Sequence, residues 1–128
     1  MKRNSKFDLW PLCFLCFISF TTNVQAECKP NLGENHTWRF SAYAKKDCID
    51  IIGSWHEGSC ADNTWSKCYN IKTNSGVDSY MWLALHSIKI RLYKDNSCKE
   101  ALNTFATDRI VPDTEERRYS SFRVYCDI

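Results

Sequence analysis

Cysteine content is the feature that most restricts how this chain can fold. The 128 residues contain eight cysteines, and two of these, Cys13 and Cys16, lie in an apolar N-terminal run. Six cysteines lie outside this run. In a short chain that folds in an oxidising compartment, this even number predicts three disulfide bonds, whose pairing the sequence leaves open. Each disulfide contributes about 2–4 kcal/mol, against about 5–15 kcal/mol for the stability of a whole domain. The six cysteines expected to pair are Cys28, Cys48, Cys60, Cys68, Cys98 and Cys126.

The N-terminus has the three parts of a secretory signal. A basic start is followed by a mostly apolar run at residues 9–20 and by the small residues Val24 and Ala26. This pattern predicts a signal peptide over residues 1–26 that is cleaved after Ala26. The apolar run is shorter than the roughly 20 residues that a membrane-spanning helix needs. We therefore expect a secreted, extracellular protein without a membrane span, formed by a single domain at 27–128.

Charge and glycosylation follow from this cleavage. Residues 1–26 hold three of the 17 Lys and Arg and one of the 15 Asp and Glu, so the remaining chain is close to neutral. A neutral domain argues against a nucleic-acid partner held by bulk charge, so we expect no binding to nucleic acid. We also expect the protein to be a monomer. Asn35-His36-Thr37 is an N-glycosylation sequon, which predicts a glycan on an exposed Asn35.

An internal repeat runs through the rest of the chain. Residues 38–48 and 88–98 lie fifty residues apart, and each alternates apolar and polar residues up to a Tyr that is followed five residues later by Cys. A period of two indicates half-buried β-strands. The residues predicted to face inward are Trp38, Phe40 and Ala42 in the first copy and Ile88, Ile90 and Leu92 in the second.

Further strands complete each copy of the repeat. Residues 79–83 and 121–126 also alternate, with Tyr80 and Trp82 inward in the first and Phe122, Val124 and Cys126 inward in the second. Several short strands separated by turns favour an all-β sandwich. We expect two units, at about 37–84 and 87–128, related by a pseudo-twofold axis. Weaker strands are expected at 67–71 and 109–111, and 99–105 is either a strand or a short helical turn.

The spacing of these motifs resembles that of the βγ-crystallins. Tyr93-Lys-Asp-Asn-Ser-Cys98 stands where their Greek-key motifs carry an aromatic corner, and Ser120-Ser-Phe-Arg-Val124 is similar to their closing strand. The resemblance implies a disulfide-stapled, two-motif Greek-key sandwich, in which a Ser hydroxyl ties the folded hairpin to the closing strand. Tyr43 and Ser79 are 36 residues apart against 28 for Tyr93 and Ser121, so we expect an enlarged loop at Gly53–Asn63.

The chain also departs from that family pattern. Asp50 and Glu100 replace the corner glycine, and Cys48 and Cys98 replace the second aromatic residue. The cysteines make the chain similar to small secreted fungal proteins and killer-toxin-like members. The stretches equivalent to the family's calcium loops, 74–79 and 116–121, lack the paired oxygen ligands that calcium needs. We therefore expect no metal and no cofactor.

The resemblance implies binding outside the cell rather than catalysis. The expected function is that of a host-directed effector or a killer-toxin-like antimicrobial, whose partner is an extracellular protein or a cell-surface component of a host or competitor. We predict contact through Trp55, His56 and Trp65 in and beside the enlarged loop, because exposed aromatic residues favour partner contacts. Burial of the two tryptophans against the sheet is the alternative.

Other functions stay open. A secreted protease inhibitor would use a rigid exposed loop, and a structural extracellular protein would need no partner. A small ribonuclease or other hydrolase would use His56 and Glu57 for acid–base chemistry, although His36 and His86 lie apart from them in the sequence. His56, Cys60 and Cys68 form only a partial zinc set, which export and disulfide formation disfavour. Lys45-Lys46 and Arg117-Arg118 are expected to be solvated turns, or a cationic patch if the fold brings them together.

Overall fold

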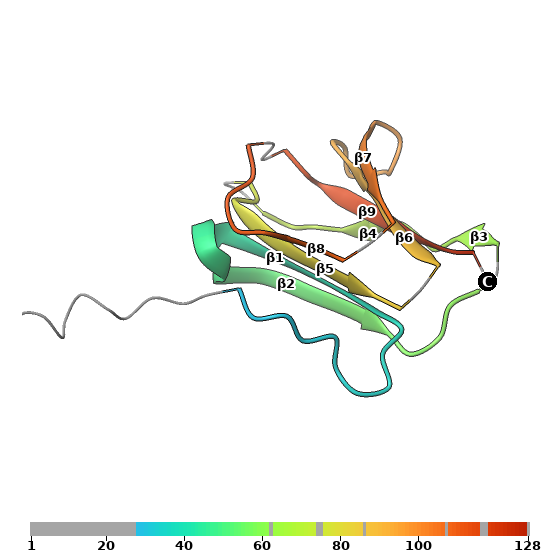
Figure 1. Ribbon diagram of the computed structural model, residues 1–128. Coiled ribbons are helices and arrows are strands. Elements are labelled where there is room, and N and C mark those ends of the chain that lie inside the picture. The colour runs from blue at the N-terminus through green and yellow to red at the C-terminus, as the bar shows by residue number, and fades with distance from the viewer. Residues whose placement is uncertain are drawn as a thin grey trace, which may run out of the picture.

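The chain folds into strands joined by turns (Figure 1). The computed structural model describes residues 28–61, 63–73, 76–85, 87–106, 108–115 and 118–127, so the predicted signal peptide at 1–26 lies outside the described residues. A short 3-10 turn, η2, covers Lys46–Cys48. The strands are β1 (Trp38–Lys45), β2 (Ile49–Glu57), β3 (Thr64–Trp65), β4 (Tyr69–Asn70), β5 (Ser79–Ala84), β6 (Ile88–Tyr93), β7 (Ala101–Phe105), β8 (Arg109–Val111) and β9 (Ser121–Cys126).

These strands form two antiparallel sheets, which confirms the all-β class. Sheet A has the order β2-β1-β5-β8, and sheet B has the order β3-β9-β6-β7 with β4 also pairing with β9. Sheet A takes β1, β2 and β5 from the first unit (about 37–84) and β8 from the second (about 87–128), whereas sheet B takes β6, β7 and β9 from the second unit and β3 and β4 from the first. The two units therefore cannot form these sheets independently.

The predicted internal repeat extends to the backbone hydrogen bonds. The register of β1 against β2 shifts between Ala42 and Tyr43, and that of β6 against β7 shifts between Leu92 and Tyr93, fifty residues later. The amide of Asp78 donates to the carbonyl of Tyr43, and the amide of Ser120 donates to the carbonyl of Tyr93, both at 2.9 Å. The two copies thus bend at equivalent positions and join their closing strands in the same way.

A buried serine in each closing strand holds the turn that follows the first strand. The Ser79 hydroxyl donates to the Lys45 carbonyl at 2.6 Å, and the Ser121 hydroxyl donates to the Asp95 carbonyl. Both serines are fully buried. Lys45 and Asp95 occupy equivalent positions of the repeat. The tie between hairpin and closing strand that the sequence resemblance implies is therefore present as a contact in both copies.

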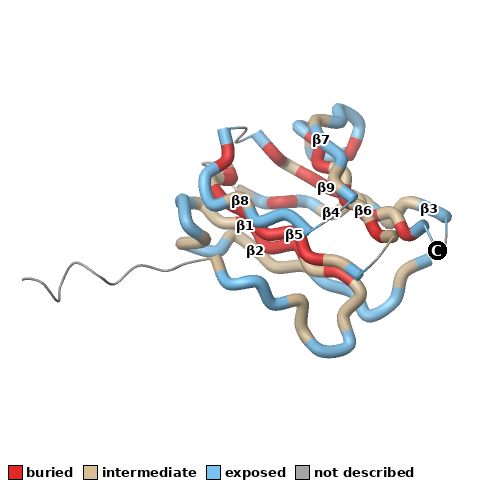
Figure 2. The backbone as a smooth tube through the Cα atoms, viewed as in Figure 1, coloured by how far each residue is buried: buried red, intermediate tan, exposed pale blue. Residues whose placement is uncertain are grey.

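Aromatic side chains join the two sheets. Phe122 of β9 lies 4.8 Å from Phe40, 4.9 Å from Tyr69, 5.4 Å from Trp55 and 6.0 Å from Trp38, measured between ring centroids. Figure 2 shows the buried residues along the central strands β1, β5, β6 and β9. The inward positions predicted for those four strands are confirmed, since every one of these side chains is buried.

Three disulfides pair all six cysteines: Cys28–Cys48, Cys60–Cys126 and Cys68–Cys98, with Cα–Cα distances of 5.1, 5.9 and 6.0 Å. The predicted number of disulfides is confirmed. Cys48 and Cys98 are equivalent positions of the repeat, and each attaches a preceding segment to its own turn. Cys60–Cys126 instead joins the segment after β2 to the end of β9, and so connects the two halves of the chain.

The predicted enlarged loop at Gly53–Asn63 is wrong for its first half. Residues 53–57 belong to β2, which pairs with β1 over its length. Alternation does not reveal this strand, because Ile51 is 60% exposed and Gly53 contributes no side chain. A Cβ on Gly53 would lie 2.6 Å from the Trp55 ring, so the glycine leaves room for that ring. Elsewhere, 99–105 resolves into strand β7, and the weak strands at 67–71 and 109–111 correspond to β4 and β8.

We expect the serine tie to be a measurable part of stability. Replacing Ser121 with Ala removes the donor and leaves the Asp95 carbonyl without this partner, so the free energy of unfolding should fall by about 1–3 kcal/mol. Chemical denaturation of the oxidised protein measures this change. Ser59→Ala, at an exposed position, is the control and should have little effect. Equal stability of the two variants would contradict the role of the tie.

The Asp95 side chain gives this turn a pH dependence. Its carboxylate accepts the amides of Glu100 (2.8 Å), Lys99 (2.9 Å) and Ser97 (3.0 Å). These hydrogen bonds lower the pKa of Asp95 below its usual 3.8, and the bond from Glu100 has the largest effect. Because the pKa is lower in the folded state, the ionised carboxylate stabilises the fold at pH values above the unfolded-state pKa. This stabilisation is lost as the pH falls through the folded-state pKa.

Asp95→Asn should therefore be less stable than the wild type at neutral pH, and the difference should shrink as the solution is acidified below the ordinary aspartate pKa. Thermal unfolding of both proteins across this pH range measures it. Asp127→Asn, at an exposed position, is the matched control. A difference that stays constant with pH would show that the carboxylate charge does not hold the turn.

Candidate functional site

The start of the described chain lies over the middle strands, β1 and β5, of the outer face of sheet A. The Arg39 guanidinium donates to the Asn31 carbonyl at 3.4 Å. Lys29 and Asn31 share a narrow cavity of about 210 Å³ with outward residues of β1 and β5. Met81 and Leu83, which point to this face, are only 8% and 5% exposed. Cys28–Cys48 fixes the covering segment at one end, so the part of this face formed by β1 and β5 is largely covered.

Sheet B has an outer face of different character. Because Ile88, Ile90 and Leu92 of β6 and Phe122, Val124 and Cys126 of β9 are buried, the alternate residues point outward. No strand of this sheet contains Asp or Glu. We call the outward set formed by Trp65, Lys89, Arg91, Arg123 and Tyr125 the cationic face.

Aromatic rings position two of the three cations. The Lys89 ammonium lies 4.9 Å from the centroid of the Tyr125 ring, and the Arg91 guanidinium carbon lies 4.4 Å from that of Trp65. Arg91 Nε also donates to the Thr104 hydroxyl at 3.0 Å. Trp65 and Tyr125 contact each other at 5.0 Å. Cation–π contacts of this kind attract and orient a charged group while leaving its charge uncompensated.

Arg91 and Arg123 are direct cross-strand partners in the pairing of β6 with β9. Like charges placed directly opposite each other destabilise a sheet. Arg123 Nε is buried, and it has no hydrogen-bond partner among the described residues. Neither arginine forms an ion pair in the part of the chain that the structure describes. This arrangement is chemically suited to receive an anion from outside the protein.

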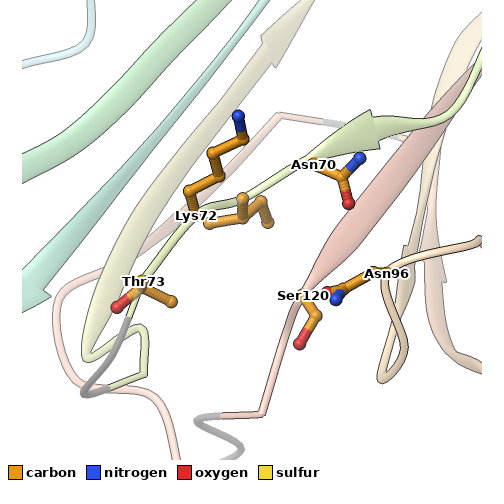
Figure 3. Close-up of a pocket in the computed structure, with 6 residues that line it drawn as sticks. Asn70, Lys72, Thr73, Asn96 and Ser120 are labelled. Carbon is orange, nitrogen blue, oxygen red and sulfur yellow. The ribbon is translucent and has the colours of Figure 1, made fainter.

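A polar cleft of about 620 Å³ lies at one end of sheet B. Asn70, Ile71, Lys72 and Thr73 form one wall, and Asn96 and Ser120 form the other (Figure 3). The Ile71 amide donates to the Ser120 carbonyl at 2.9 Å, and Cys68–Cys98 crosslinks the two walls two residues from Asn70 and Asn96. The lining offers amides, hydroxyls and one ammonium group, with no carboxylate.

The structure separates the residues that the sequence predicted to form one contact surface. Trp55 is half-buried in the core, where its ring contacts Phe40 at 6.0 Å and Phe122 at 5.4 Å. Trp65 belongs to the cationic face on the outside of sheet B, and His56 is exposed on sheet A. For Trp55, the alternative of burial against the sheet is the one observed.

His56 has a partner that sequence distance concealed. Its ring stacks on His36, with 3.9 Å between centroids, and Nδ1 of His36 lies 2.9 Å from the Leu32 carbonyl oxygen. The neighbouring Glu57 accepts a hydrogen bond from Tyr69 at 3.4 Å. Burial raises the pKa of the Tyr69 hydroxyl, and the charge of Glu57 raises it further. His86 lies outside the described residues.

The structure also bears on the candidate zinc ligands and on the first basic pair. Cys60 and Cys68 are in disulfides and cannot join His56 in a zinc site. Among the described residues no three His, Cys, Asp or Glu side chains are grouped as metal ligands. Lys45 and Lys46 pair with Asp50 (3.0 Å) and Asp113 (3.5 Å).

Two further predictions are not tested by the structure. Asn35 is exposed in a turn, and its glycosylation stays a prediction. Arg117 is not among the described residues, so the predicted joining of the two basic pairs has no test.

The alternation in residues 88–92 places Lys89 and Arg91 on the side opposite the inward residues, but the sequence alone did not reveal the cationic face. The signal was present, because Arg123 lies between the inward residues Phe122 and Val124. What was missing was the pairing of β9 with β6, which places Arg123 opposite Arg91.

In the part of the chain that the structure describes, no helix has the length and apolar character needed to cross a bilayer. Comparison with known proteins found no matching family model, no similar curated protein and no similar solved structure.

Proposed function

We propose that this is a secreted, non-enzymatic binding protein that contacts a negatively charged partner outside the cell through the cationic face. The observation that carries the proposal is the pair formed by Arg91 and Arg123, two like charges directly opposite each other without a carboxylate partner among the described residues. The partner is an extracellular or cell-surface component of a host or competitor. The protein acts on it as a host-directed effector or a killer-toxin-like antimicrobial.

The physical argument rests on the contrast between basic residues. Lys45 and Lys46 lie beside carboxylates, as expected for solvated surface cations. The three cations of the cationic face lie on strands without a carboxylate, and two of them are held against aromatic rings. Orienting these side chains before binding lowers the entropy lost when a partner is bound. An anionic partner would also relieve the repulsion between Arg91 and Arg123.

We further propose that the fold is a βγ-crystallin-like Greek-key sandwich. Three observations support this: the fifty-residue repeat, the exchange of connecting strands between the sheets and the two equivalent serine ties. Fold likeness does not specify a partner, because function depends on sites that vary within a fold. The cationic face therefore carries the functional proposal, and the fold explains only how it is presented.

Cell binding tests the proposal. Labelled, oxidised protein is incubated with intact yeasts, bacteria, and animal and plant cells at increasing salt concentrations. We expect saturable binding to at least one cell type that weakens with salt, and that falls about tenfold or more in Arg91→Gln/Arg123→Gln, since each charge-assisted hydrogen bond contributes about 1.5–3 kcal/mol. Growth and viability of the bound cells then distinguish a toxin from an effector.

Lys45→Gln/Lys46→Gln is the matched control, because it removes the same charge from another surface and should retain binding.

Stability provides a second readout. Arg123→Gln alone relieves the like-charge pair, so its unfolding free energy should be unchanged or up to about 1 kcal/mol higher. Equal loss of binding in both double variants, or binding that ignores salt, would contradict the cationic face as the contact surface.

A hydrolase is the second candidate, because the structure brings His36 and His56 into contact. Two histidines within reach of one substrate group can act as acid and base. From the proposed binding function we expect no turnover of RNA or of ester substrates by the oxidised protein. Turnover that disappears in His56→Ala but persists in Arg91→Gln/Arg123→Gln would replace the binding proposal with an enzymatic one.

A further inference from the structure

We infer that the anionic partner is an acidic polysaccharide, bound along the cationic face while the polar cleft binds the hydroxyl groups of an adjoining sugar unit; this inference rests on the proposed function. Its basis is the combination of two surfaces on one sheet. The cationic face supplies three cations, two of them held against aromatic rings, and the cleft supplies mainly neutral hydrogen-bonding groups. A polymer of charged, hydroxyl-rich units matches both surfaces.

The spacing of the cations suits a linear polyanion. Lys89 and Arg91 are two residues apart on β6, which separates them by roughly 7 Å along the strand. Arg123 lies beside Arg91 on the neighbouring strand, roughly 5 Å away. A single small anion would contact the arginine pair and leave Lys89 unused. A chain with a carboxylate or sulfate on successive units would contact all three cations.

The cleft lies close enough to receive the same chain. Asn70 pairs with Ser121, and Arg123 is two residues further along β9. This diagonal relation places Asn70 roughly 7–8 Å from Arg123 on the outer side of the sheet. Side chains of Asn70, Lys72, Asn96 and Ser120 line the cleft, and within the described residues none of them has a side-chain hydrogen bond. They are available to sugar hydroxyls, and Cys68–Cys98 keeps the two walls in place.

Nucleic acid fits the cationic face less well. Single-stranded nucleic acid is bound by aromatic platforms on which bases stack. Here the Trp65 ring is occupied by Arg91 and contacts Tyr125, whose own ring carries Lys89. Duplex binding depends on many phosphate contacts, whereas the cationic face has three cations. Both features favour a partner that is recognised by charge and hydroxyl groups without base stacking.

A lipid surface is also disfavoured. Peripheral membrane binding combines basic residues with apolar side chains that enter the bilayer. The large apolar side chains that are exposed among the described residues are Ile51, Leu85 and Ile110. None of them belongs to a strand of sheet B. The cations and the apolar groups are therefore not presented together.

Binding of defined oligomers to the full, oxidised protein tests the inference. The probes are an oligogalacturonate, which carries carboxylates, and a heparin-derived oligosaccharide, which also carries sulfates. A neutral cello-oligosaccharide of equal length, a single-stranded DNA oligomer and phosphatidylserine vesicles are compared at the same salt concentration. Fluorescence anisotropy or calorimetry gives the affinities. The variants are Arg91→Gln/Arg123→Gln, Asn70→Ala/Asn96→Ala and the control Lys45→Gln/Lys46→Gln.

We expect one or both acidic oligosaccharides to bind, and the neutral one to bind at least about tenfold more weakly. The arginine variant should lose about tenfold or more in affinity and reduce the salt dependence. The cleft variant should lose a few-fold with unchanged salt dependence, because it removes neutral contacts. The lysine control should match the wild type.

Tighter binding to DNA or to vesicles than to either oligosaccharide would overturn the inference and leave an anion-binding face intact. Cell binding that requires Arg91 and Arg123, without affinity for either acidic oligosaccharide, would also overturn the inference alone. Wild-type affinity in the arginine variant for every anionic probe would instead overturn the proposed function. If the cleft variant binds the acidic oligosaccharides as tightly as the lysine control does, the cleft is not part of the binding site and that part of the inference is wrong.

Discussion

The aromatic cluster around Phe122 is the interaction on which the two-sheet arrangement depends. Phe122 belongs to the last strand of the described residues, yet its ring contacts Trp38, Phe40, Trp55 and Tyr69, all from the first unit of the repeat at about 37–84. Aromatic pairs contribute about 0.5–1.5 kcal/mol each beyond the area they bury. Such contacts form only after distant segments meet, so their loop-closure entropy must be overcome first. Cys60–Cys126 restricts the same long loop, because it ties the first half to the strand that carries Phe122.

Strands and their inward faces could be predicted wherever alternation was strict, as in residues 88–92 and 121–126. Prediction failed for β2, where Ile51 points to solvent and Gly53 replaces an inward side chain with space for Trp55. It was weak for β4, which has two residues, and for β8, which has three. Their sheet membership is set by hydrogen bonds such as that from the Ile71 amide to the Ser120 carbonyl. Local sequence does not encode these long-range pairings.

The candidate site was harder to predict than the fold, and for a related reason. Trp55 and Trp65 are ten residues apart in the sequence but belong to different sheets, so proximity along the chain suggested a shared surface that does not exist. Arg91 and Arg123 are 32 residues apart and are direct partners. A period of two gives the face on which a side chain lies, whereas strand register decides which side chains meet. Net charge was also misleading, because a near-neutral chain gave no sign of a face whose basic residues have no carboxylate partner among the described residues.

The proposed binding function and the stability of this domain have conflicting requirements, and the disulfides lessen the conflict. Placing Arg91 opposite Arg123 weakens sheet B, and a small all-β domain has limited apolar burial with which to offset such a defect. Two of the crosslinks, Cys60–Cys126 and Cys68–Cys98, attach neighbouring segments to sheet B or to the turn between its strands β6 and β7. The third, Cys28–Cys48, secures the segment that covers sheet A. Covalent constraint therefore supports the sheet whose surface is least favourable to folding, and it leaves that surface open to a partner.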